Sequence, residues 1–235
     1  MHKVVVLSAD GVIPFDLSVP LETFGRARLP DGSSAYEVIV AGAAGPGAEI
    51  NAGAFSLRPQ RGLEAFDGAG TILVPGVRNV AAPVADHVLD ALRAAAGSGS
   101  RIASICVGAF ILAAAGLLDG QRATTHWAAA DSLAQAYPAV TVDAGVLYVD
   151  NGQILTSAGA AAGLDLCLHL IRRDHGSAIA AQVARRSVMP LERPGGQAQF
   201  IDHAPPAAHG SSLGRVPRIW RWGWDRPAVC MIAMT

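Results

Sequence analysis

Cys106 stands where a reactive thiol is expected in an α/β protein. The stretch "RIASICVGAFILAAAG", residues 101–116, reads as a β-strand, a cysteine and then a helix. A thiol at such a junction faces the positive end of the helix dipole and unpaired backbone N–H groups, and both favour the thiolate. Gly108 lets the backbone approach closely there. The alternative is an inert cysteine that fills the apolar core.

The segments around Cys106 predict a sheet that would expose this junction. Short runs rich in valine, isoleucine and leucine indicate strands buried on both faces, and they alternate with segments of helical periodicity. Strands are expected at "KVVVLSA", "YEVIVAG", "TILVPG", "RIASI", in a strand or hairpin arm at 49–60, and in two arms joined by Asn151-Gly152. Helices are expected at 16–28, 81–100, 107–120, 160–174 and 178–187.

This alternation predicts an α/β fold with a mostly parallel sheet and helices on both faces. In such a sheet ligands bind at the carboxyl ends of the strands, where loops lead into helices. Cys106 follows the strand "RIASI" directly. The predicted fold therefore places the thiol at the edge where chemistry occurs.

The composition excludes several classes of protein. The chain has 235 residues, of which 51% are hydrophobic, and a formal net charge of -1. It can bury a sizeable core, and it has no net field that would attract nucleic acid or an anionic membrane. The 3 cysteines are too few and too scattered for a disulfide framework or a zinc site.

The N-terminus runs into a strand-like segment with no apolar signal region. The longest run of apolar residues and glycines, 107–118, is shorter than the roughly 20 residues that span a bilayer. We therefore expect a soluble, cytoplasmic protein that does not contact membranes.

The sequence resembles the ThiJ/PfpI superfamily over most of residues 3–201. The resemblance rests on "ICVGAFILAAAGLLDGQRATTHW", on "FDLSVPLETF" after the first strand and on "ILVPG" before the elbow. It implies the flavodoxin-like fold of class I glutamine amidotransferases, with Cys106 at a nucleophile elbow. Two branches are similar: isonitrile hydratases, through "LLDGQRATTHW", and AraC-type transcriptional regulators, through "VARRSVMPLERPGGQAQFI", residues 183–201.

The resemblance implies that Asp16 lies beside the thiol. Asp16, in "PFDLSVP", matches the acidic residue of the hydratase branch. A carboxylic acid there can donate a proton and then accept one. Asp16 is also suited to be the N-cap of a helix that starts at Leu17. Glu22, further along that helix, is a weaker candidate, and we expect it on the surface or in packing.

The motif "ATTHW" follows the elbow and contains Thr125 and His126. In related sequences a histidine at this place approaches the thiol, so the resemblance makes His126 a catalytic candidate and Thr125 a weaker one. A histidine beside Trp127 at a strand end is otherwise more often structural.

Two backbone N–H groups are candidates for an oxyanion-type cradle. Gly76 ends "VPG" and would lie next to Cys106 if the two strands are neighbours. Its N–H and that of Val107 would then face a developing negative charge. Val77 stands where many relatives have a second glycine, so the shape of the cradle departs from theirs.

Other residues with chemical potential do not form a site. "GAAGPG", residues 42–47, resembles a phosphate loop, but no helix and no lysine follow, so we expect a turn. Cys167 fits the core face of a helix. We predict no metal site and no cofactor, because the remaining histidines lack partners at ligand spacing (His87, His169 and His175). The arginines of the last helices are expected on solvated faces (Arg172, Arg173, Arg185 and Arg186).

The organisation changes near residue 202. We expect one amidotransferase-like domain over 1–201 and an irregular tail over 202–235, rich in proline and tryptophan. Relatives in the regulator branch continue into a DNA-binding domain, but the tail has no helix-turn-helix pattern. We hypothesise that a frameshift or truncation has replaced that domain. The alternative is that the Arg/Trp-rich tail binds a partner or single-stranded nucleic acid.

Two functions follow from these patterns. The first is the ligand-sensing domain of an AraC-type regulator, which binds a small molecule at Cys106 and reaches DNA only through a second domain. The second is an isonitrile hydratase-like lyase, in which a Cys106 thioimidate is opened by water to an N-substituted formamide. Whether the chain is an enzyme stays open at this point, and the resemblance implies a homodimer.

Overall fold

The structure, a computed structural model, describes residues 1–193, 196 and 197. The chain divides by its contacts into two units, Met1–Ile201 and Asp202–Thr235, and everything described belongs to the first. The predicted tail and its tryptophans lie outside the described residues. Within the described part, no helix has the length and apolar character needed to cross a membrane.

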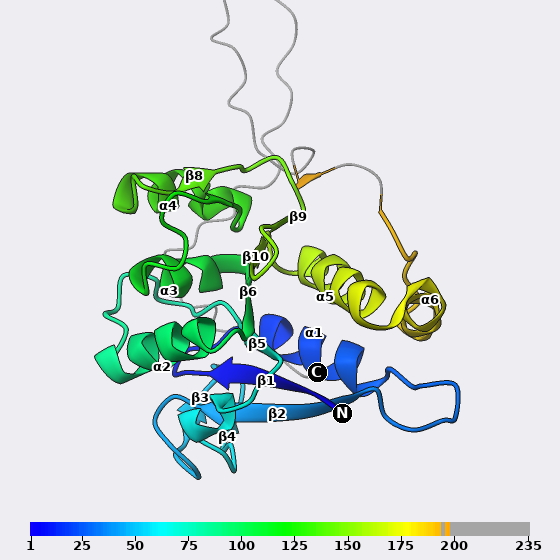
Figure 1. Cartoon of the computed structure of the whole chain (residues 1–235). Helices are drawn as coiled ribbons and strands as arrows, with labels where there is room; N and C mark the ends of the chain where they lie inside the picture. Colours follow the sequence, from blue (N-terminus) through cyan, green and yellow to red (C-terminus); the bar gives the residue numbers. More distant parts are fainter. Residues whose placement is uncertain (194–195, 198–235) are drawn as a thin grey trace, which may run out of the picture. The chain divides into compact units, whose positions relative to one another are not determined.

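Strands and helices alternate along the chain, as the sequence predicts (Figure 1). The strands are β1 (His2–Ser8), β2 (Tyr36–Gly42), β3 (Ile50–Asn51), β4 (Ser56–Leu57), β5 (Thr71–Val74), β6 (Arg101–Ile105), β7 (Arg122–Ala123), β8 (Thr141–Val142), β9 (Tyr148–Asp150) and β10 (Ile154–Ser157). The α-helices are α1 (Pro14–Gly25), α2 (Asp86–Gly97), α3 (Ala109–Ala114), α4 (Ala130–Ala136), α5 (Ala161–His175) and α6 (Ser177–Arg186). Short 3-10 helices cover Leu63–Phe66, Cys106–Gly108 and Trp127–Ala129.

Six strands form the central sheet in the order β2-β1-β5-β6-β10-β9. The strands β2, β1, β5, β6 and β10 are parallel to one another, and β9 at the edge runs antiparallel to β10. The turn at Asn151-Gly152 joins these last two strands, as predicted, and Gly152 has the positive φ of 90° that such a turn favours. The parallel strands all end at one edge of the sheet, where ligand sites form in this class of fold.

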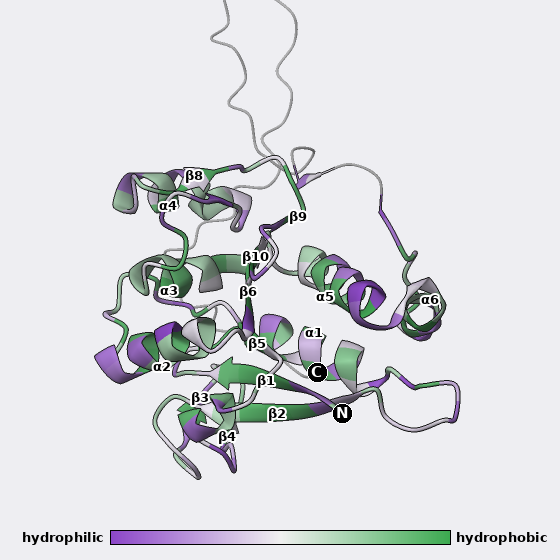
Figure 2. Cartoon of the chain, viewed as in Figure 1, coloured by the Kyte–Doolittle hydropathy of each residue, from purple (hydrophilic) through white to green (hydrophobic). Residues whose placement is uncertain are grey.

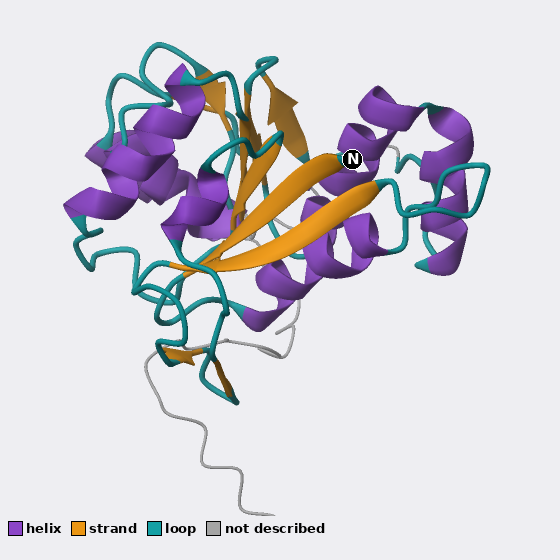
Figure 3. Cartoon of the chain, turned by 60° about the horizontal axis from the view of Figure 1, so that its bottom comes forward, coloured by secondary structure: helices purple, strands orange, loops and turns teal. Residues whose placement is uncertain are grey.

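Helices cover both faces of the sheet, which confirms the predicted α/β architecture (Figures 1 and 3). Each face of the sheet carries its own apolar core, and the side chains of β1 alternate between these two cores. Helices on both faces are needed to cover them. Val4 and Val6 pack with α1, α5 and α6, whereas Val5 and Leu7 pack with α2 and α3. β1 is accordingly apolar over most of its length (Figure 2).

The helix after Cys106 is shorter than the sequence predicts. It was expected to run to Asp119-Gly120, but α3 ends at Ala114. Gly116 has a φ of 73°, and the Leu117 N–H donates to the Leu112 carbonyl at 3.0 Å. This pattern terminates a helix one turn earlier than the aspartate would. Residues 49–60 form a small antiparallel hairpin, β3 with β4.

Candidate functional site

Four connections at the carboxyl edge of the sheet meet around Cys106. Asp16 comes from α1, which follows β1, and Gly76 follows β5. Cys106 follows β6, and the pair Gly159–Ala160 follows β10. The sequence alone predicts the first three; the fourth becomes visible only in the folded chain.

Cys106 has the backbone conformation of an elbow. Its φ is 57°, a left-handed conformation that is uncommon for a residue other than glycine. A Cβ at Gly108 would collide with the carbonyl oxygen of Val74, so this position needs glycine for the close approach that the sequence predicts. The Cys106 side chain lies at the junction of strand and helix, although the residue is only 7% exposed.

Asp16 points toward the thiol and does not cap its helix. Pro14 begins α1, and the N-cap residue is Ile13, without a side-chain hydrogen bond. The prediction that Asp16 is an N-cap is therefore wrong. Asp16 is 2% exposed, and its Oδ1 accepts the N–H of Ala160 at 3.3 Å. Its Oδ2 has no hydrogen-bond partner that meets normal geometry in the described chain.

Burial dominates the charge state of this pair. It raises the pKa of Asp16, and the Ala160 N–H, the Cys106 thiol and the Gly76 N–H offset it only in part. Burial, followed by the charge of Asp16, raises the pKa of Cys106 to about 12. The expected thiolate is therefore not the state that this arrangement favours. The Val107 N–H does lower the pKa of the thiol, but α3 is short and desolvation outweighs it.

The connection Gly159–Ala160 closes over the thiol. A Cβ at Gly159 would lie 2.8 Å from Cys106 Sγ, so only glycine fits there. Ala160 has φ 48° and ψ -127°, a combination that is costly for a residue with a side chain. Sequence reasoning missed both residues. The only signal was the run of small residues "SAGAAAG" after a strand.

The backbone cradle differs from the prediction. Gly76 does lie close by, since a Cβ there would be 2.7 Å from Asp16 Oδ2 and 3.0 Å from Val107 Cγ2. Its N–H interacts with Asp16, whereas the N–H of Val107 interacts with the thiol. The two groups therefore serve different members of the Cys–Asp pair. Val77 pairs with Val12 in an isolated bridge and makes part of the core on the α2 side.

The "ATTHW" motif touches the elbow through Thr125. The buried Thr125 hydroxyl donates to the carbonyl of Cys106 at 3.0 Å and thereby holds the elbow in place. His126 makes no interaction with Cys106 among the described residues. Its Nδ1 accepts the N–H of Ala128 at 3.3 Å, its ring lies 5.5 Å from that of Trp127, and burial lowers its pKa.

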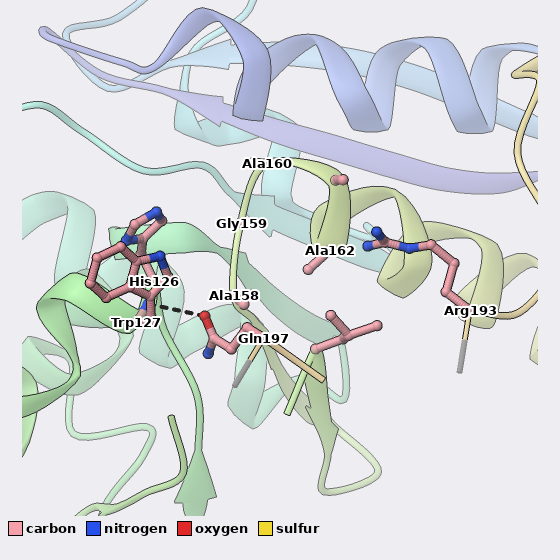
Figure 4. A pocket seen from close by; sticks show the side chains of 10 residues that line it. His126, Trp127, Ala158, Gly159, Ala160, Ala162, Arg193 and Gln197 are labelled. Atoms are coloured by element: carbon pink, nitrogen blue, oxygen red, sulfur yellow. Dashed lines mark hydrogen bonds between the residues drawn. The ribbon is translucent and has the colours of Figure 1, made fainter. Parts of the chain in front are cut away.

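A cavity of about 330 Å³ lies on the other side of the Gly159–Ala160 connection (Figure 4). His126 and Trp127 form one wall, and the start of α5 forms another. Arg193 and Gln197, from the regulator-like signature, complete the lining. The volume suits a small organic molecule. The sequence did not single out these last two residues individually.

The remaining candidates lie elsewhere. Glu22 is on the exposed face of α1 and pairs with Arg26. Cys167 is fully buried in α5, which confirms its predicted place in the core. Residues 42–47 form turns, as expected. No three His, Cys, Asp or Glu side chains of the described chain are placed to hold a metal ion.

Curated relatives point to two kinds of protein. The chain is 42% identical over 97 residues to the HTH-type transcriptional regulator CdhR of Pseudomonas aeruginosa, a match that covers 41% of this chain and 29% of that protein. It is 38% identical over 115 residues to the isonitrile hydratase of Pseudomonas putida, covering 48% and 49%. The chain thus spans less than half the length of these relatives.

Solved structures share the fold at low identity. An AraC family transcriptional regulator from Pseudomonas putida superposes with a TM-score of 0.69 at 19% identity, covering 80% of this chain and 100% of that one. Drosophila melanogaster DJ-1beta superposes with a TM-score of 0.68 at 20% identity, covering 80% and 98%. The model of the DJ-1/PfpI family matches residues 2–173, so the chain belongs to the DJ-1/PfpI family.

Proposed function

We propose that this chain is a ligand-sensing DJ-1/PfpI domain of the AraC-type regulator branch. The observation that carries the proposal is the cavity beside the elbow, because Arg193 and Gln197 of the regulator-like signature line it. Its other polar element is His126, whose pKa is lowered by burial. Such a cavity can bind a small molecule without any covalent step at the thiol.

The state of the thiol supports sensing over turnover. A pKa of about 12 leaves Cys106 protonated at neutral pH, and the residue is nearly inaccessible behind Gly159. A nucleophilic enzyme needs the thiolate within reach of its substrate. In the sensor, Cys106 and Asp16 support Gly159 and Ala160, which line the cavity.

A thermal-shift screen of small metabolites against the intact chain tests the proposal. We expect at least one compound to raise the melting temperature, since a ligand at 100 times its Kd stabilises by about 2.7 kcal/mol. The variant Trp127→Ala removes a cavity wall and should lose that response. The variant Phe55→Ala changes an exposed aromatic residue outside the cavity and should keep it. Binding that survives Trp127→Ala would contradict the cavity assignment.

An isonitrile hydratase activity is the second candidate, and the Cys106–Asp16 pair favours it. The thiol sulfur would bond to the terminal isonitrile carbon while Asp16 delivers its proton to that carbon, and the proton of the thiol would pass to the Asp16 carboxylate, giving a thioimidate and restoring the carboxylic acid. Water then adds to the thioimidate carbon, the C–S bond breaks, and an N-substituted formamide and the free thiol result. Because the pKa of Asp16 is raised, this carboxyl group is suited to deliver the proton.

Formamide production from a simple isonitrile distinguishes the two candidates. Mass spectrometry would follow the intact chain, Cys106→Ser and Asp16→Asn. Turnover that disappears in both variants would establish the hydratase and displace the sensor. No turnover from a folded chain leaves sensing as the function. Self-association to a homodimer remains a prediction, which light scattering checks.

A further inference from the structure

Residues 191–193, 196 and 197 lie across the cavity, and we refer to them as the strap. They belong to the signature that resembles the regulators, yet the function proposed above uses only their presence at the cavity wall. Gln197 lines the cavity beside Trp127, and Arg193 lines it beside α5 (Figure 4). The strap is thus the part of the lining that comes latest in the chain.

The first anchor of the strap is an ion pair with α5. Arg193 Nε donates to both carboxylate oxygens of Asp165, at 3.0 and 3.1 Å. Asp165 is only 6% exposed, so Arg193 is what compensates its charge. Glu192 adds a second, more exposed pair with Arg172 of the same helix.

The second anchor is Gln197, which is 3% exposed and has its amide fully engaged. Its Oε1 accepts the N–H of Trp127 at 3.0 Å. Its Nε2 donates to the carbonyl of Thr125 at 3.0 Å and to the hydroxyl of Thr124 at 3.2 Å. Thr125 in turn holds the carbonyl of Cys106, so two hydrogen-bonded steps join the strap to the elbow.

At Gly196 the strap lies close against Gly145, since a Cβ there would be 1.9 Å from the Gly145 carbonyl oxygen. A second cavity, of about 310 Å³, lies on the α5 side and is lined by Arg193, Glu192 and His169 among others. Arg193 and Leu147 line both cavities. Leu191 packs at the margin of the core. Directional polar contacts, together with the close approach at Gly196, therefore hold the described part of this segment against the domain, and such polar contacts are lost together when one partner is removed.

We infer that the strap is a two-anchor element, which docks as one unit and completes the ligand cavity. The inference rests on the proposed sensing function, since a ligand is what the docked strap would enclose. A molecule in the cavity contacts the strap and the loop 124–127 simultaneously. Its binding and the docking of the strap therefore favour each other.

Breaking one anchor and reading the other tests whether the strap is one unit. In the full chain, Asp165→Asn should raise cleavage by the endoproteinase GluC after Glu192 by about tenfold. It should also speed hydrogen exchange of the Trp127 amide, whose acceptor is Gln197, by a similar factor. Gln197→Ala should also raise the cleavage after Glu192, although the variant changes neither Arg193 nor Asp165. Glu49→Gln, at an exposed ion pair, is the matched control and should change neither.

Asp165→Asn and Gln197→Ala test the inference independently, so one of them suffices if the other folds poorly. Cys167, fully buried in α5, should stay unreactive toward iodoacetamide in any variant that is used. If each variant loosens only its own anchor, or if neither loosens anything, the inference is overturned. No ligand enters this experiment, so its failure leaves the ligand screen intact. A failed screen would likewise leave the docking of the strap standing.

Discussion

The two ends of the central sheet both bury charged side chains, but they treat them in opposite ways. At the carboxyl end, Asp16 has a buried oxygen without a hydrogen bond of normal geometry among the described residues, and Cys106 sits in a left-handed conformation. At the amino end, Asp174 accepts two hydrogen bonds from Arg101, at 2.7 and 2.8 Å, and one from the Tyr36 hydroxyl at 2.9 Å. The carboxyl end thus leaves the hydrogen bonding of its buried carboxyl group incomplete, whereas the amino end pairs both oxygens of its carboxylate.

The surroundings of the amino end reinforce this contrast. The Tyr36 ring is flanked edge-on by the rings of His2 and His175, at 5.4 and 5.0 Å. Burial acts to raise the pKa of Asp174, but Arg101 and Tyr36 outweigh it and the pKa is lowered. These contacts tie β1, β2 and β6 to α5 at the amino end. The carboxyl end holds a proton-binding pair at the cost of strain, which is typical of a functional site.

Removing the charge partner at the amino end should cause the largest loss of stability. Asp174→Ala leaves the guanidinium of Arg101, whose side chain is 12% exposed, without its partner. We expect a loss of about 3–5 kcal/mol in the free energy of unfolding, measured by urea denaturation. Asp16→Asn should change that free energy by less than about 1 kcal/mol, because it removes a carboxylate that the fold does not fully pair. Equal losses would erase the distinction between the two ends.

Adding one methyl group should distinguish rigid from adjustable surroundings. In Gly108→Ala the new Cβ meets the backbone carbonyl of Val74, which cannot move, so a loss of about 2–3 kcal/mol is expected. In Gly70→Ala, at the amino end, the Cβ meets the ring of His2 at 2.6 Å, and a side chain can turn away. Thermal unfolding of both variants should show the smaller loss for Gly70→Ala. The reverse order would contradict the elbow geometry.

Cys106 and Cys167 should differ in the rate at which they react with iodoacetamide. In a Cys230→Ser background, Cys106 should react slowly at pH 8 and faster as the pH rises toward its pKa of about 12. Asp16→Asn removes the negative charge that raises this pKa and should speed the reaction at pH 8 by about tenfold, which corresponds to about 1.4 kcal/mol. Cys167 should stay unreactive throughout. An unchanged rate in Asp16→Asn would mean that the carboxylate does not act on the thiol.

The smallest effect is a difference in the sign of the pH dependence of stability. The raised pKa of Asp16 stabilises the fold at acid pH, and that contribution is lost as the pH rises through the folded-state pKa. The lowered pKa of Asp174 stabilises the fold above its ordinary pKa, and that contribution is lost as the pH falls through the folded-state pKa.

Urea denaturation between about pH 2 and 7 reads both slopes, because Asp174 acts below its ordinary pKa and Asp16 acts above its own. Relative to the parent chain, Asp16→Asn should gain stability as the pH rises, because residue 16 then carries no ionisable group. Asp174→Asn should move in the opposite direction. Parallel curves for the two variants would show that burial does not act on Asp16 as the structure indicates.

Local sequence patterns determined the α/β architecture and the position of the Cys106 thiol at the end of a strand. Runs such as "KVVVLSA" and "TILVPG" are apolar at consecutive positions, because a parallel strand is buried on both faces, and this signal needs no knowledge of its neighbours. The order strand, cysteine, helix placed the thiol at the carboxyl end of a strand, and the resemblance to the ThiJ/PfpI superfamily implied the elbow. The Asn151-Gly152 hairpin also followed from local backbone preference.

Tertiary structure alone decided the chemistry at Cys106. The raised pKa of the thiol comes from burial and from Asp16, which is 90 residues away in the chain (106 − 16), and desolvation has no signature in local sequence. Gly159–Ala160 was missed for a related reason, and the strap was noticed only as part of the regulator-like signature, without a place in the fold. Small residues and Gln197 gain meaning only through what packs against them, and those contacts join segments that the sequence keeps far apart.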